Sequence, residues 1–138
     1  MADLIINTDL VGPGGPGGRV LQSIGSVAID RGQPVVYDSA TNKWSLASAD
    51  TVDNAVVGGL CISPCAADGD TFSLWEIGPV ILGATLVKGQ IYVLSPTLSG
   101  KIFTAAELTT GDFVTILGVA SSSTVLEFDP VVSGIDRA

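Results

Sequence analysis

Residues 31–36 read Arg31-Gly32-Gln33-Pro34-Val35-Val36, and residues 88–93 repeat this pattern as Lys88-Gly89-Gln90-Ile91-Tyr92-Val93. Each copy places a basic residue, a glycine and a glutamine directly before a run that contains β-forming residues. A second short motif also occurs twice in the same order, because Gly59-Leu60-Cys61 matches Gly118-Val119-Ala120. This order of motifs predicts that the chain contains one β-meander twice.

A third pair of matching segments lies at the end of each copy. Residues 74–80 match residues 125–131, since both segments place a glutamate between apolar residues and end in Pro-Val. The three pairs together predict pseudo-repeats over about residues 27–82 and 84–132. Either half alone would bury too little apolar surface to be stable. We therefore expect two duplicated β-meander halves that face each other across one core.

Alternation along the third pair predicts which side chains point inward, because every second residue of a strand shares a face. We expect four apolar side chains in the core and both glutamates outside: Trp75 and Ile77 flank Glu76, and Leu126 and Phe128 flank Glu127. Two matched carboxylates could also form a catalytic pair, as in glycosidases. Solvated strand residues are the favoured interpretation, since nothing near them in the sequence would tune a carboxyl pKa.

The rest of the chain alternates between β-forming runs and turn residues. Short runs rich in Val, Ile, Thr and aromatic residues are separated by Gly, Asp, Asn and Ser. Gly78-Pro79 interrupts the longest run and predicts a bulge or bend there. The pattern predicts an all-β fold, either a small barrel or a sandwich. The expected strands lie at 34–37, 43–46, 56–62, 71–82, 91–94, 101–103, 113–120 and 124–128.

Residues 1–25 differ from the β-barrel domain expected over residues 26–138. The tract Gly12–Gly18 consists of glycine and proline, so it cannot form a helix or a regular central strand. One interpretation is a flexible linker. The other is an extended N-terminal arm with a Pro/Gly linker, whose apolar tip docks on a neighbouring protein. The partner-contact residues of such an arm would be Leu4, Ile5, Ile6, Leu10 and Val11.

Composition disfavours several classes of function. The 138 residues contain no histidine, which removes Ser-His-Asp triads, Cys-His pairs and His-bound zinc. Six Lys and Arg against 14 Asp and Glu give a net charge of −8, and scattered basic residues disfavour nucleic-acid binding. No apolar stretch approaches the roughly 20 residues that cross a bilayer. We therefore expect no enzyme activity, no cofactor, no metal site, no nucleic-acid partner and no membrane contact.

Three further motifs admit a chemical and a structural interpretation. Asp68-Gly69-Asp70 has the spacing that opens some calcium loops, but the other ligands are missing, so a β-turn is favoured. Lys88 precedes a turn glycine, as in lipoyl or biotinyl carriers, but its neighbours differ, so a surface lysine is favoured. Cys61 and Cys65 could form a disulfide, but Pro64 stiffens the link, so packing of Cys61 as a small hydrophobe is favoured.

The strand starts Gly32-Gln33 and Gly89-Gln90, with the Gly-containing segments 59–61 and 118–120, carry a resemblance to a known family. The body Val27–Val132 resembles the small β-barrel decoration, or cement, proteins of tailed-bacteriophage capsids. The resemblance implies a protein added to the outside of a viral shell. It also implies trimers at local three-fold points and an N-terminal arm that clamps capsid subunits.

The same resemblance implies a function and a location. The expected partner is the major capsid protein, the expected assembly is a homotrimer, and the expected function is stabilisation of the shell without catalysis. The protein would reside on the capsid surface of a virion assembled in the bacterial host cytoplasm. The alternative is a β-module of a phage tail fibre or baseplate that binds a carbohydrate or protein receptor.

Overall fold

The computed structural model describes residues 6–15, 18–49, 53–95, 100–104 and 113–136. These residues form β-strands and one short 3-10 helix, so the all-β prediction is confirmed. The elements are η1 (Thr8–Leu10), β1 (Gly12–Pro13), β2 (Arg19–Ile24), β3 (Pro34–Asp38), β4 (Lys43–Leu46), β5 (Val57–Ser63), β6 (Thr71–Ile81), β7 (Ile91–Leu94), β8 (Ile102–Thr104), β9 (Phe113–Ala120) and β10 (Val125–Asp136).

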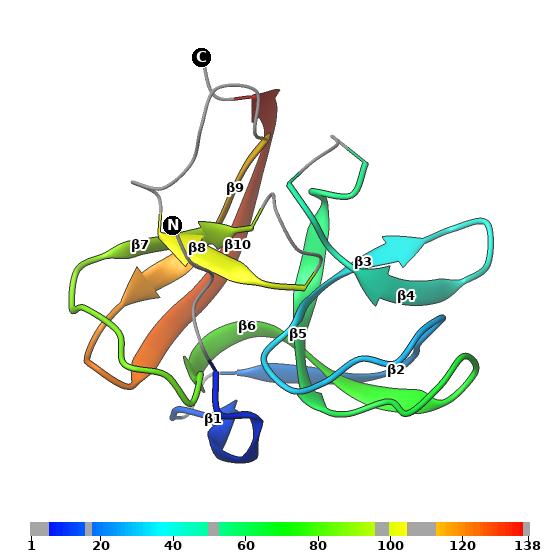
Figure 1. Ribbon diagram of the computed structural model, residues 1–138, viewed down its shortest axis with the longest axis horizontal. Helices are drawn as coiled ribbons and strands as arrows, with labels where there is room; N and C mark the ends of the chain where they lie inside the picture. Colours follow the sequence, from blue (N-terminus) through cyan, green and yellow to red (C-terminus); the bar gives the residue numbers. More distant parts are fainter. Residues whose placement is uncertain (1–5, 16–17, 50–52, 96–99, 105–112, 137–138) are drawn as a thin grey trace.

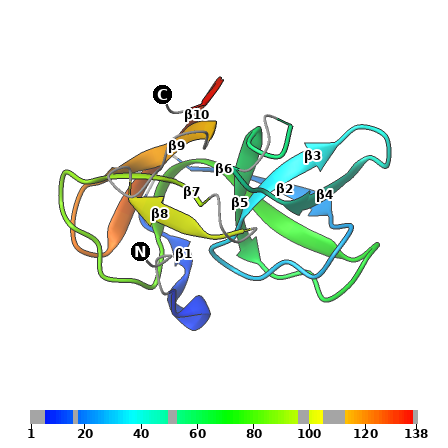
Figure 2. The same cartoon turned by 45° about the horizontal axis from the view of Figure 1, so that its top comes forward.

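The strands form one antiparallel sheet that curls into an open half-barrel (Figure 1). Its order is β4-β3-β5-β6-β10-β9-β7-β8, and β1 and β2 also pair with β6. Two lobes are visible in Figures 1 and 2: one carries β2 to β5, and the other carries β7 to β10. Strand β6 runs from one lobe into the other, so it holds the two together.

The change of lobe occurs in the middle of β6. Residues Thr71–Ile77 pair with β2, and part of the same stretch also pairs with β5. Gly78–Ile81 pairs instead with β10, and its last two residues also pair with β1. Gly78 has a φ of +118°, a conformation that glycine adopts without a steric penalty. The bend predicted at Gly78-Pro79 is therefore present, and it redirects the strand between lobes.

Strands β3 and β5 pair in the same way as strands β7 and β9. In each of these two pairs the register runs through two residues of the first strand and then shifts at the third. A shift of this kind is a β-bulge, which bends the strand and sharpens its twist. The paired residues are Pro34 with Leu60, Val35 with Gly59 and Val36 with Val57 between β3 and β5, and Ile91 with Val119, Tyr92 with Gly118 and Val93 with Ile116 between β7 and β9.

The turns before these strands also match. The Gly32 N–H donates to the Cys61 carbonyl at 2.8 Å, and the Gly89 N–H donates to the Ala120 carbonyl at 2.8 Å. Both glycines have a φ of +85°. A side chain would be strained at either turn, which explains why glycine occurs in both motifs.

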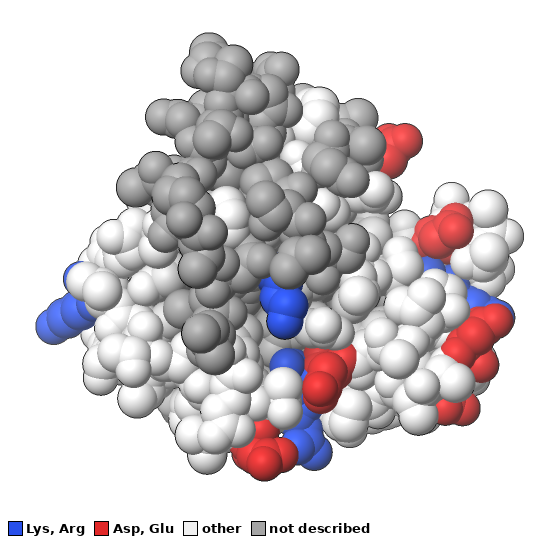
Figure 3. Space-filling view, in the orientation of Figure 1, with Lys and Arg blue, Asp and Glu red and all other residues white. Residues whose placement is uncertain are grey.

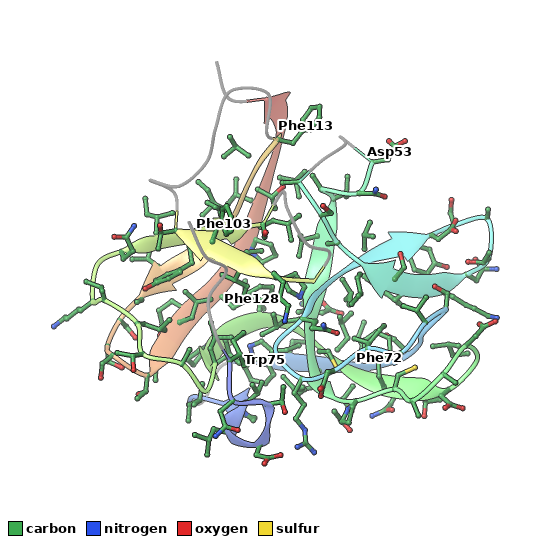
Figure 4. The ribbon with its side chains drawn as sticks, in the orientation of Figure 1. Asp53, Phe72, Trp75, Phe103, Phe113 and Phe128 are labelled. Atoms are coloured by element: carbon green, nitrogen blue, oxygen red, sulfur yellow. The ribbon has the colours of Figure 1, made fainter. Side chains whose placement is uncertain are left out.

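The buried side chains form three clusters. The largest contains residues of both lobes, among them Val36, Leu60, Tyr92 and Phe128. A second cluster lies in the lobe of β2 to β5 and includes Val35 and Phe72, and a small third cluster joins Val93 to Phe103 in the other lobe. Figure 4 shows Phe72 and Phe103 in these two lobes. Because Val35 and Val36 point to opposite faces of β3, the first lobe uses one face for its own core and the other for the shared core.

The inward-facing residues were predicted correctly except for one. Trp75, Leu126 and Phe128 are buried. The prediction was wrong for Ile77, which is exposed on the surface. The pairing of β2 with β6 shifts between Val20, opposite Trp75, and Arg19, opposite Ile77, so Glu76 is an extra residue that interrupts the alternation.

Candidate interaction surface

The N-terminal part of the chain lies along one edge of β6 (Figure 2). Strand β1 pairs with the end of β6, the Gly14 N–H donates to the Pro79 carbonyl at 2.8 Å, and β2 continues along β6 to Thr71. Gly18 passes directly against the Trp75 ring, where any Cβ atom would overlap the ring. The described part of residues 6–24 therefore packs on the chain's own body, and glycine permits the close approach.

The five predicted partner-contact residues do not share one environment. Leu4 and Ile5 lie outside the described residues. Ile6 is half-buried against the shared core, and Val11 is buried. Leu10, between them, is 60% exposed. Of the described residues in this set, Leu10 is the one that is most exposed to solvent.

Local hydrogen bonds explain why Val11 points inward and Leu10 outward. The Asn7 N–H donates to the Gly83 carbonyl at 2.8 Å, which anchors the segment to the turn after β6. The Asn7 side chain accepts from the Asp9 N–H and caps η1. The turn of η1 then directs Leu10 to solvent. Beside Leu10 lies a shallow pocket of about 250 Å³, which is lined by Ile81, Gly83 and Thr124.

Strand β2 presents a second group of apolar side chains. Val20, Leu21 and Ile24 are 45, 48 and 42% exposed. In the part of the chain that the structure describes, no strand pairs with the outer edge of Arg19–Ile24. Strand β4 lies close to β2 without pairing with it, and just beyond β2 the Ser26 N–H donates to the Trp44 carbonyl at 2.8 Å. We call Leu10, Val20, Leu21 and Ile24 the N-terminal edge.

Sequence reasoning missed β2, because residues 1–25 were interpreted as a linker or arm. The signal was present in Arg19–Ile24, a run of six residues with three large apolar side chains directly after the last glycine of the tract. Such a run is typical of a strand. What the sequence could not provide is its position on the edge of β6, since the paired residues lie about fifty positions away in the chain.

Charged side chains of the described residues gather on the lobe that carries β3 and β4 and along the lower edge in Figure 3. Two ion pairs occur among them. Arg19 Nε lies 2.7 Å from Glu76 Oε2, and Lys43 Nζ lies 2.8 Å from Asp68 Oδ1. In each pair one partner, Arg19 or Asp68, is mostly exposed to solvent, so each pair contributes little to folding stability.

The matched glutamates have separate partners. Glu76 pairs with Arg19, whereas Glu127 accepts a hydrogen bond from the Ser121 hydroxyl at 3.0 Å. Glu127 lies opposite Pro79 in the sheet rather than opposite Glu76. Asp68-Gly69-Asp70 forms a turn in which Gly69 has a φ of +90°. Each motif therefore has a structural role in the described chain.

The two cysteines are free and buried. The Cys61 thiol donates to the Ser63 carbonyl at 3.3 Å, and the Cys65 thiol lies near the carbonyls of Val27 and Ala67. Burial raises the pKa of the Cys61 thiol to about 12, against an ordinary value of 9.0. The thiol is thus held in its protonated form, as its packing in the first-lobe core requires.

This raised pKa predicts a loss of stability at alkaline pH. The folded state keeps the Cys61 proton at pH values where the unfolded chain releases it. The contribution of this thiol to the free energy of unfolding is therefore complete below pH 9, and it declines between pH 9 and about 12. Urea unfolding should show a loss of about 1 kcal/mol between pH 8 and 10 that the Cys61→Ala variant lacks. Equal declines in both proteins would contradict this assignment.

No group of three or more Cys, Asp or Glu side chains within the described ranges is placed to hold a metal ion. The same residues contain no helix with the length and apolarity needed to cross a membrane. Comparison of the chain with protein-family models, curated proteins and solved structures found no match in any of the three.

Proposed function

We propose that the protein is a decoration protein of a tailed-bacteriophage capsid, which binds the outside of the shell and stabilises it. The observation that carries the proposal is the N-terminal edge, where exposed apolar side chains lie beside a strand edge that no other described strand pairs with. An exposed apolar edge strand is a site for unwanted aggregation unless a partner covers it. A protein whose ordinary state is assembly onto a larger structure has such a partner.

The chemistry of the edge favours a protein partner. The outer edge of β2, which pairs with no strand of the described chain, can accept an added strand, and Val20, Leu21 and Ile24 can fill apolar pockets on that partner. The shallow pocket beside Leu10 can accept one apolar side chain in return. We propose the major capsid protein as this partner, with three copies of the chain at local three-fold points.

Stabilisation of the shell would follow from mass action. A protein that binds only the expanded shell lowers its free energy by RT ln(1 + [L]/Kd) at each site. A closed shell carries many such sites, and their contributions add. Moderate affinity at each site can therefore stabilise the shell against a large internal pressure. Leu4 and Ile5, which lie outside the described residues, remain part of the proposed contact.

We also propose that the two meanders arose as copies of one unit. The matching bulges at Val36 and Val93, and the matching turns at Gly32 and Gly89, support this origin. In both copies a glycine lies on the second strand of the pair, at Gly59 and Gly118. Unrelated meanders have no reason to share a bulge position, a turn and a glycine.

The test is binding of the protein to shells of the phage whose genome encodes it. Replacement of Leu21 with lysine leaves the fold intact, because the side chain is exposed, but it places a charge on the edge. We expect Leu21→Lys to weaken co-sedimentation with expanded shells at least about thirtyfold, the loss typical of a central contact residue. Particles imaged with the bound protein should show it in groups of three on the outer surface.

Val119→Lys is the matched control. Val119 is similarly exposed, but it lies on β9, which is paired on both sides. This variant should bind shells as the unaltered protein does. Equal loss in both variants would reject the N-terminal edge as the contact. Density on the tail rather than the shell would reject decoration in favour of a tail-fibre or baseplate module.

A further inference from the structure

The turns that begin the two meanders differ in what covers them. Gly32 is buried, and a Cβ atom added there would lie 3.2 Å from the Ile6 side chain and 3.3 Å from that of Val11. Gly89, the matching residue, is exposed, and no atom lies within 4 Å of an added Cβ atom. The N-terminal segment thus covers the first turn, whereas nothing in the described chain covers the second.

The uncovered turn presents apolar side chains. Val87 is 64% exposed, the largest exposed fraction among the large apolar residues of the described chain, and Ile91 is 39% exposed. The matching positions of the first copy hold Asp30, which is charged, and Pro34, which is buried. Both positions are therefore apolar and exposed in the second copy only.

This turn is fixed before any partner binds. The Gln90 N–H donates to the Val87 carbonyl at 2.9 Å, and the Val87 N–H donates to the Tyr92 hydroxyl at 3.0 Å. Tyr92 is itself buried, so Val87 is tied to the core. A partner would lose little binding free energy in ordering this turn.

The charges on the surface indicate what the partner carries. Lys88 is exposed and forms no ion pair with a described residue. Asp9 is also exposed and forms no ion pair there, and it precedes Leu10, which is 60% exposed. The turn and η1 thus each join an exposed apolar side chain to a charge without an ionic partner, and the two charges are opposite.

The two surfaces lie on different sides of the molecule. Figure 1 shows η1, in dark blue, at the lower edge, and the turn before β7 at the outer end of the lobe of β7 to β10. Figure 2 shows the same separation from a second direction. A copy can therefore contact one neighbour through η1 and another through the turn, and such head-to-tail contacts can close a ring.

We propose that this turn binds the η1 segment of a second copy of the chain. Leu10 of one copy packs on Val87 and Ile91 of the next. Asp9 of the first copy then pairs with Lys88 of the second. Chains of net charge −8 repel one another at long range, so a contact between copies needs opposite charges placed locally.

This contact rests on the proposed function and deepens it, because it joins the three copies to one another. It also divides the N-terminal edge between two partners. Strand β2, which lies along Thr71–Ile77, is left to bind the shell. Leu10 lies beside Gly83 at the other end of β6 and binds the neighbouring copy.

Charge reversal in the full chain tests the contact by analytical ultracentrifugation. The unaltered protein should sediment as three associated chains of 14.0 kDa each when its concentration is raised to about 1 mM. Lys88→Glu should weaken the association at least about tenfold, because it brings two carboxylates together. Asp9→Lys should also weaken it, although this change makes the net charge less negative. The double variant should restore association, because it rebuilds the pair in the opposite sense.

Arg31→Glu is the matched control, because Arg31 holds the position of Lys88 in the first copy, where the turn is already covered. It changes the net charge as Lys88→Glu does, and it should leave association unchanged. A chain that stays monomeric at about 1 mM would overturn the proposal. So would a double variant that associates no better than the single variants, or a control that weakens association as Lys88→Glu does.

The failure of this contact can be told apart from the failure of shell binding. No shell is present in the sedimentation measurement, so a monomeric chain there would reject the contact between copies alone. Lys88→Glu should still co-sediment with shells, because it leaves β2 intact.

Discussion

Replacement of Trp75 with alanine should reduce the free energy of unfolding by about 4 kcal/mol, the cost of removing a large buried aromatic side chain. Trp75 is 3% exposed and lies where the two lobes meet (Figure 4). It pairs with Val20 on one edge of β6 and with Leu60 on the other. Loss of the ring would therefore open a cavity between the lobes and beneath the N-terminal segment at once.

Trp75→Phe separates the two contributions of this residue. Phenylalanine retains most of the apolar volume, but it loses the hydrogen bond from the indole Nε1 to the Gly78 carbonyl at 3.1 Å. We expect it to cost about 2 kcal/mol, from one buried hydrogen bond and some lost packing. Urea unfolding followed by circular dichroism measures both variants. A loss below 1 kcal/mol in Trp75→Ala would show that the ring does not join the lobes.

Replacement of Gly118 with alanine should cost about 3 kcal/mol, at the upper end of the range for overpacked sites. A Cβ atom at this position would overlap the main-chain oxygen of Glu127 on the neighbouring strand. Main chain in the centre of a sheet cannot rotate away as a flexible side chain can. The strands β9 and β10 would have to separate locally and would weaken their pairing at Phe128.

Gly12→Ala is the matched control for this prediction. Gly12 also lies in a strand, but no atom lies within 4 Å of an added Cβ atom. The substitution should leave stability unchanged or raise it slightly, because alanine reduces the entropy of the unfolded chain. The same urea titration compares both variants. Equal stability of the two would mean that β9 and β10 are not as closely paired as described.

Strand positions were largely predictable from the sequence, because local composition and turn residues determine them. The bounds of β4, β7 and β9 agree with the expected ranges 43–46, 91–94 and 113–120. Strand β10 is longer than expected, since a proline normally ends a strand. The structure keeps the strand by a shift in pairing between Phe128 and Val131, which leaves Pro130 outside the regular ladder.

Register was less predictable, because it depends on the partner strand. The sequence comparison matched Leu74 with Val125, and Cys61 with Ala120. In the sheet, Leu74 lies opposite Cys61, whereas the residue opposite Ala120 is Leu126. Sheet pairing thus places Leu126 in the position that corresponds to Leu74. A single-residue difference reverses the face of every side chain, and the bulge at Glu76 reversed that of Ile77.

The candidate surfaces were predictable only in part. Leu10 was expected as a contact residue from its apolar neighbourhood, and it is exposed. The edge of β2 was not expected, because β2 is positioned by β6, which lies far away in the chain. No local pattern in either segment indicates the other.

The eleven residues of β6 also determine how the molecule can be divided. A cut in the connection between β6 and β7 leaves one fragment with all of β6 and the other with β10 stripped of its neighbour along Gly78–Ile81. Each fragment lacks a strand that the other holds, so separation leaves both incomplete and mixing restores the missing pairing. Recombination that exchanged one half between related genes would have to preserve the pairing of β6 with β10. The two halves would therefore be inherited together.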